Sequence, residues 1–103
     1  MKIAVIGAGL MGRAAVYDLS RAEGVTSVVV YDIDKKLAAS VAKKYGNNKT
    51  KSGGLDAGNV SAAFKILDGC DAAISCVTYK YNYGLTQAAI KAGCHFVDLG
   101  GNN

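Results

Sequence analysis

The sequence predicts an α/β fold, a three-layer doubly wound parallel sheet of about five strands in the order 3-2-1-4-5. Two observations predict it. Short apolar segments alternate with segments of helical periodicity, and a glycine-rich turn follows the first apolar segment directly. The chain has 103 residues, of which 50% are hydrophobic. That length and composition are typical of one domain, which we place at residues 1–103.

The N-terminal half contains the clearest pattern of strands and helices. Lys2–Ile6 is a β-branched run that ends at glycine, as expected for a strand covered on both faces. The following segment, about Leu10–Ala22, predicts a helix whose apolar positions include Leu10 and Leu19. A second buried strand is expected at Ser27–Tyr31.

The middle of the chain is the least patterned part. Asp34 is placed to cap a helix that runs to Tyr45, and Gly46 is placed to close it. The third strand that a doubly wound sheet requires has only the polar stretch "NKTKS" (48–52) to form it. Because an edge strand can be short and polar, we expect it there.

The C-terminal half returns to a regular alternation. We expect a helix at Val60–Leu67, a strand at Ala72–Val77, a helix at 83–92 capped by Gly93, and a last strand at His95–Leu99. Repeated strand–helix alternation predicts parallel strands joined by right-handed crossovers.

The turn "GAGLMG" (7–12) matches G-x-G-x-x-G between a strand and a helix, the fingerprint of a Rossmann dinucleotide site. Gly7 permits the sharp turn, Gly9 lets a pyrophosphate approach the backbone, and Gly12 lets the helix pack closely. Leu10 and Met11 begin the helix, whose free N–H groups and dipole favour phosphate. A tight turn with no ligand is the alternative.

Asp32 completes this site, because it ends the second strand 20 residues beyond Gly12 (32 − 12). There a carboxylate accepts hydrogen bonds from the adenosine ribose, with Ile33 beside it. A 2′-phosphate would be repelled by this carboxylate, so NAD is the expected cofactor. Lys35 and Lys36 leave NADP as the alternative, and a capping or surface role is the alternative for Asp32.

Ligands of such sheets lie at the carboxyl ends of the strands. The loop after the Ala72–Val77 strand is therefore expected near the pyrophosphate and the nicotinamide ribose. Its candidate contacts are Cys76, Val77, Thr78 and Tyr79, with ordinary packing equally expected for Tyr79. Asp56 is a candidate for the adenine edge or for capping the next helix.

Composition excludes several other classes. The net charge is +4, and six lysines lie between residues 35 and 51, but no arginine accompanies them. A solvated face is therefore expected and no nucleic-acid partner, with a basic nucleic-acid binder as the alternative. Three cysteines and one histidine have no zinc spacing, so we expect structural thiols and no metal. With no signal peptide and no apolar run of about 18 residues, we expect a cytoplasmic protein without a membrane partner.

Three segments resemble the N-terminal cofactor domain of the saccharopine dehydrogenase family, including its lysine 6-dehydrogenase-like members. They are "KIAVIGAGLMGRAAVYDL" (2–19), "DAAISCVTYKYNYGLTQAAIKAG" (71–93) and "CHFVDLGGNN" (94–103). The last is the most specific, because the glycine motif is shared by many dehydrogenases. Thr78 departs from the family, where proline is frequent, and residues 49–54 match its third strand poorly.

The resemblance implies an NAD(P)-dependent oxidoreductase that acts on a carbon–nitrogen bond of an amino acid or derived amine. In the family a second domain supplies most of the substrate and proton-transfer groups. We therefore expect a fragment of a two-domain enzyme that is not catalytic alone, and we assign no catalytic residue. His95 is expected to be a packed or edge residue, and Asp98 is a candidate for the cleft. Association of two copies of the chain into a homodimer is a further possibility.

The alternative function belongs to another class. The chain would then be a free-standing NAD-sensing domain, similar to the regulatory domains of potassium transport. Those domains share the first strand, the glycine motif and the acid that ends the second strand. The ending "HFVDLGGNN" favours the dehydrogenase.

Overall fold

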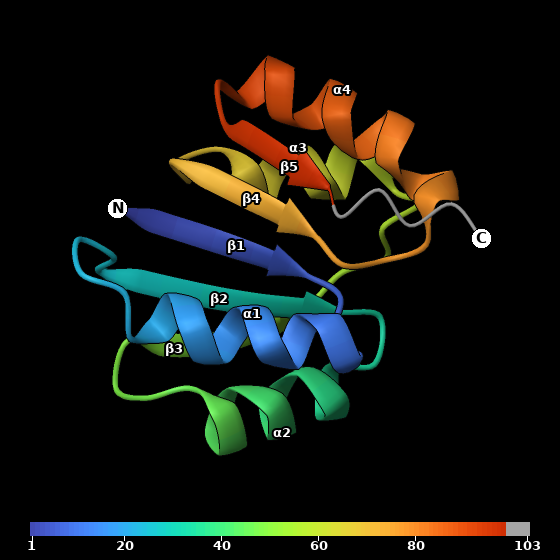
Figure 1. Cartoon of the computed structure of the whole chain (residues 1–103). Coiled ribbons are helices and arrows are strands. Elements are labelled where there is room, and N and C mark those ends of the chain that lie inside the picture. The colour runs from blue at the N-terminus through green and yellow to red at the C-terminus, as the bar shows by residue number, and fades with distance from the viewer. Residues whose placement is uncertain (99–103) are drawn as a thin grey trace.

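Strand β1 (Lys2–Ile6) lies in the middle of the sheet because both of its faces are apolar. Side chains alternate along a strand. Ile3 and Val5 therefore pack into the core beneath helices α1 (Leu10–Ser20) and α2 (Lys35–Tyr45). Ala4 and Ile6 pack into the core beneath α3 (Val60–Leu67) and α4 (Asn82–Ala92). The result is three layers, helices on both faces of one sheet (Figure 1).

The computed structural model describes residues 1–98 and confirms the predicted strand order, β3-β2-β1-β4-β5, with every pair parallel. The remaining strands are β2 (Ser27–Asp32), β3 (Thr50–Gly54), β4 (Ala72–Ser75) and β5 (His95–Asp98). Because the chain leaves β1 toward β2 and later returns to β4 on the other side, the order reverses at β1. A crevice opens there at the carboxyl ends.

Helix α1 buries only part of the predicted face, since Leu19 packs partly buried against the core but Leu10 does not. Leu10 is 79% exposed, whereas Gly12, Val16 and Ser20 are buried. The hydroxyl of Ser20 lies 2.7 Å from Oγ1 of Thr50, which gives this buried polar group a partner. The helix ends at Ser20, two residues before the predicted end at Ala22.

The third strand lies two residues later than predicted, at Thr50–Gly54 instead of 48–52. Its register with β2 pairs Val28 with Thr50 and Asp32 with Gly54. Gly46 closes α2 in an extended conformation, φ −91°, and not in the left-handed one. Glycine is needed there for space, since a Cβ would lie 2.4 Å from Thr50.

Two of the predicted helix caps, Asp34 and Gly93, are confirmed, and one, Asp56, is wrong. Asp34 caps α2, as predicted, by accepting a hydrogen bond from Leu37 N at 3.1 Å. Gly93 ends α4 in the left-handed conformation, φ +70°. The cap of α3 is Asn59, which accepts from Ala62 N, so the capping role considered for Asp56 is wrong.

Two segments near the C-terminus also differ from prediction. Strand β4 ends at Ser75, before Val77, and a short 3₁₀ turn, η1 (Tyr79–Tyr81), precedes α4. Leu99, which was expected to end the last strand, lies outside the described residues.

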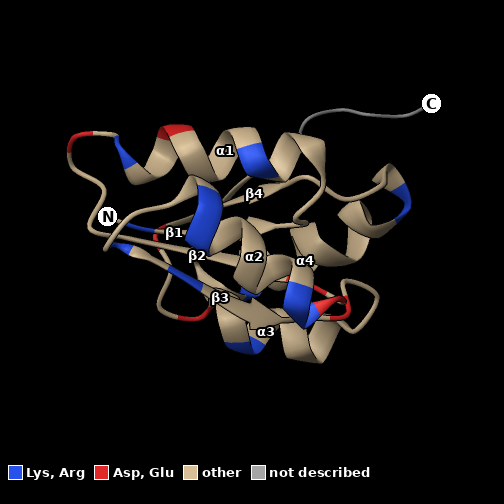
Figure 2. Cartoon of the chain, turned by 90° about the horizontal axis from the view of Figure 1, so that it is seen from below, with Lys and Arg blue, Asp and Glu red and all other residues tan. Residues whose placement is uncertain are grey.

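Basic residues are most frequent on α2, which carries Lys35, Lys36, Lys43 and Lys44 at its two ends. In the view of Figure 2, Lys and Arg occur on α1, α2 and α3. Lys49 has a structural contact, since its Nζ donates to the carbonyl of Val25 at 2.8 Å. Within residues 1–98 no helix has the length and apolar character needed to span a membrane.

Candidate functional site

The turn between β1 and α1 is built by close backbone approach. Gly7 has φ +107°, which favours glycine, and a Cβ there would lie 2.9 Å from the carbonyl oxygen of Cys76. A Cβ on Gly12 would lie 1.9 Å from the carbonyl oxygen of Gly7. The N–H of Gly7 donates to Tyr31 O at 2.7 Å, which joins the turn to the end of β2.

Gly9 differs from these two glycines because the space in front of it is open. A Cβ there would meet no atom within 4 Å, and Gly9 is the N-cap of α1 without a side chain to cap it. The N–H groups of the first helical turn thus have no side-chain cap, and Leu10 and Met11 are more than half exposed. This is the geometry of an anion site at a helix N-terminus.

Asp32, the last residue of β2, is held in place by two backbone amides. Its Oδ2 accepts from Ala8 N at 2.8 Å, within the glycine turn, and its Oδ1 accepts from Asp34 N at 2.9 Å. A carboxylate has about four acceptor positions, so two stay available for a ligand. The carboxylate is therefore oriented before any ligand binds.

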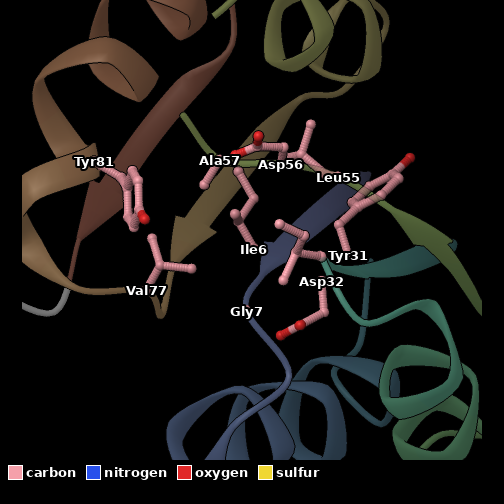
Figure 3. Close-up of a pocket in the computed structure, with 10 residues that line it drawn as sticks. Ile6, Gly7, Tyr31, Asp32, Leu55, Asp56, Ala57, Val77 and Tyr81 are labelled. Atoms are coloured by element: carbon pink, nitrogen blue, oxygen red, sulfur yellow. The ribbon is translucent and has the colours of Figure 1, made fainter. Parts of the chain in front are cut away.

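A pocket of about 110 Å³ lies at the carboxyl ends of the strands, beside this carboxylate (Figure 3). In that view Val77 and Tyr81 lie on one side of Ile6, and Tyr31 and Asp32 lie on the other. The full lining is Ile6, Gly7, Tyr31, Asp32, Ile33, Leu55, Asp56, Ala57, Val77 and Tyr81. Its apolar residues and the two carboxylates, those of Asp32 and Asp56, suit a heterocyclic base joined to a sugar.

The structure brings together only some of the predicted contacts. Gly7, Asp32, Ile33 and Val77 line this pocket. Gly9, Leu10, Met11 and Gly12 form the neighbouring helix start. From the loop after β4, Thr78 and Tyr79 are exposed and do not line the pocket.

Several lining residues were missed by the sequence analysis, Tyr31, Leu55 and Tyr81 among them. Tyr31 could have been found, because it directly precedes Asp32 at the carboxyl end of β2, where ligands of such sheets lie. Burial raises the pKa of its hydroxyl above the usual range, and Cys70 adds to this. Leu55 and Tyr81 follow segments of little pattern, so no signal singled them out.

Cys76 contributes its backbone to the turn, and its side chain packs toward the α1 and α2 core. Burial raises the pKa of its thiol from 9.0 to about 11. The thiolate is the nucleophilic form, so this cysteine is unreactive near neutral pH. The pKa values of Cys70 and Cys94 are raised as well, mainly by burial.

Residues 3–102 match the family described as Saccharopine dehydrogenase NADP binding domain. The chain belongs to this family. As a saccharopine dehydrogenase-type domain it binds a pyridine dinucleotide, NAD or NADP, and its class is that of oxidoreductase cofactor domains. The crevice at β1, with the glycine turn and Asp32, is the part of this NAD(P)-binding domain that fits such a ligand.

Solved structures share the fold of this saccharopine dehydrogenase-type domain. Apo saccharopine dehydrogenase (L-Glu forming) from Saccharomyces cerevisiae is 24% identical, with a TM-score of 0.83, over 94% of this chain and 21% of that chain. Pen from Bacillus thuringiensis is 14% identical, with a TM-score of 0.81, over 93% of this chain and 36% of that one.

A short-chain dehydrogenase/reductase (wide type) from Veillonella parvula, solved in complex with NADP, has a TM-score of 0.73 at 9% identity. The match covers 94% of this chain and 46% of that one. At these identities the likeness is one of fold. The saccharopine dehydrogenase-type domain spans less than half of each of these three chains.

Lys35 is the basic residue of this NAD(P)-binding domain that bears on cofactor choice. Its side chain lies along the end of β3, where a Cβ on Gly54 would be 2.5 Å from Lys35 Cγ. Lys35, Ile33 and Asp56 line a second, shallower pocket next to the first. The two pockets share Ile33, Leu55 and Asp56, and Lys35 is the basic residue among the residues that line them.

Proposed function

We propose that this domain binds NAD in preference to NADP and serves an oxidoreductase that acts on a carbon–nitrogen bond of an amino acid or derived amine. The observation that carries the cofactor preference is the Asp32 carboxylate, which two backbone amides orient at the end of β2. Its available acceptor positions suit the two ribose hydroxyls, and its charge opposes a 2′-phosphate.

The proposed contacts follow the course of a dinucleotide across the crevice. The pyrophosphate meets the open start of α1 at Gly9, the adenosine ribose meets Asp32, and the nicotinamide half extends past the loop after β4. The proposed cofactor-binding residues are Gly7, Gly9, Leu10, Met11, Gly12, Asp32, Ile33, Cys76, Val77, Thr78 and Tyr79.

The cofactor proposal is tested by titration with NADH and, separately, NADPH, followed by nicotinamide fluorescence. We expect saturable NADH binding, weaker NADPH binding, and NADH affinity at least about tenfold lower for Asp32→Ala, the loss of two charge-assisted hydrogen bonds. Asp18→Ala is the matched control, because it removes the same charge from the exposed side of α1. Equal binding of both cofactors, or an unaffected Asp32→Ala, would contradict the preference.

The reaction class is supported by membership of the saccharopine dehydrogenase family. We propose that the substrate-binding and proton-transfer groups belong to another domain of the same enzyme. An enzyme that contains both domains should reduce NAD⁺ with an amino acid or a secondary amine as substrate. If it reduced NAD⁺ only with the matching 2-hydroxy acid, the proposed reaction class would be wrong.

A further inference from the structure

The end of β4 contains a buried hydrogen bond that the cofactor contacts proposed above do not include. Ser75, the last residue of β4, is 1% exposed, and its Oγ lies 2.6 Å from Oδ1 of Asn82, the first residue of α4. The serine hydroxyl donates, because an amide oxygen only accepts. Leaving a buried hydroxyl unpaired is unfavourable, so this bond holds the start of α4 against the end of β4.

Tyr81 directly precedes Asn82 and is held from several directions. Its N–H donates to Thr78 O at 3.1 Å, which closes η1. Its side chain packs, half-buried, against the core beneath α3 and α4. A Cβ on Gly58 would lie 3.5 Å from its ring, so the ring reaches the loop after β3. Tyr81 thus stands beside Val77 on one side of the pocket (Figure 3), with its ring next to Gly58 of the loop after β3.

We propose that the Ser75–Asn82 hydrogen bond positions Tyr81 as the aromatic wall against which the adenine of the cofactor rests. This inference rests on the proposed function. With the ribose on Asp32, the base enters the apolar part of the pocket, where Val77 and Tyr81 stand opposite Tyr31. A side chain that is ordered before binding loses little conformational freedom when the ligand binds. More of the free energy of its contact with the base therefore contributes to affinity.

The neighbouring tyrosines do not fit this role. Tyr79 is 57% exposed and Tyr83 is 76% exposed, and neither lines the pocket. Ser75 and Asn82 do not line it either, so they act through Tyr81 and are positioning residues. Tyr83, at the same end of α4, offers a matched control.

The experiment measures the affinities of NADH and of ADP-ribose, which lacks the nicotinamide. Tyr81→Ala should weaken both about tenfold, the usual effect of removing an aromatic side chain from a base. Tyr83→Ala should leave both unchanged. Ser75→Ala should weaken both several-fold while the far-ultraviolet circular dichroism stays that of the parent. Asn82→Asp keeps an acceptor oxygen and should bind nearly as well as the parent.

A double-mutant cycle separates positioning from general loosening of the fold. If Ser75 acts through Tyr81, then Ser75→Ala should have no further effect in a Tyr81→Ala background. The inference would be overturned if the losses of affinity in the double variant were additive, or if Tyr81→Ala bound both ligands like the parent. In either case, NADH binding by the parent would leave the proposed function standing. If the parent bound neither NADH nor ADP-ribose, both would fail.

Discussion

Substitutions in the glycine turn are predicted to affect ligand binding and stability separately. Gly9 and Gly12 both belong to the motif, but their surroundings differ. A Cβ on Gly9 meets nothing within 4 Å, and the residue has φ −73°, which alanine adopts readily. A Cβ on Gly12 would lie 1.9 Å from the Gly7 carbonyl oxygen, whereas ordinary contact begins at 3.4 Å.

The magnitudes follow from these distances. Gly12→Ala requires α1 to move by about 1.5 Å from the Gly7 carbonyl (3.4 − 1.9). We expect this overpacking to lower the free energy of unfolding by about 1–3 kcal/mol. Gly9→Ala should change that free energy by less than about 1 kcal/mol, because alanine restricts the unfolded chain but is a poorer N-cap residue than glycine. Its methyl group occupies the space proposed for the pyrophosphate, so NADH affinity should fall at least about tenfold.

Urea denaturation followed by circular dichroism measures the stability of both variants, and NADH fluorescence measures their binding. The reasoning about the ligand is refuted if Gly9→Ala binds NADH like the parent, since the phosphates would then lie elsewhere. The reasoning about packing is refuted if Gly12→Ala is as stable as the parent.

Three further predictions concern other residues. Asp32→Asn should narrow the difference between NADH and NADPH affinities, because it removes the charge that opposes a 2′-phosphate; an unchanged ratio in fluorescence titrations would contradict this. Ser20→Ala removes the buried hydroxyl 2.7 Å from Thr50 Oγ1 and should lower the free energy of unfolding by about 1 kcal/mol in urea without changing NADH affinity. Cys76 has a thiol pKa raised from 9.0 to about 11 by burial, so with the other two cysteines replaced by serine, its alkylation should accelerate about tenfold per pH unit between pH 8 and 10. A rate that levels off near pH 9, measured by mass spectrometry, would mean that the thiol is not buried.

The sequence by itself determined the architecture and the centre of the site. The apolar run of β1 specifies a strand covered on both faces, and the repeated strand–helix alternation specifies a parallel sheet, which the structure confirms. Gly7, Gly9 and Gly12 could be singled out because their spacing reflects backbone requirements of a strand–turn–helix unit. Asp32 could be placed because the end of β2 lies beside that turn in any such sheet.

Only the tertiary structure decided which surfaces are buried and which distant residues meet. Strand β3 is polar and lies at an edge, so no alternation revealed its start at Thr50. Leu10 reads as a core residue but is exposed, because the close approach of α1 at Gly12 turns Val16 and Ser20 toward the sheet. Tyr81 lines the pocket because the strand order brings its loop beside the loop after β3. Such contacts between separate loops leave no periodic pattern in the sequence.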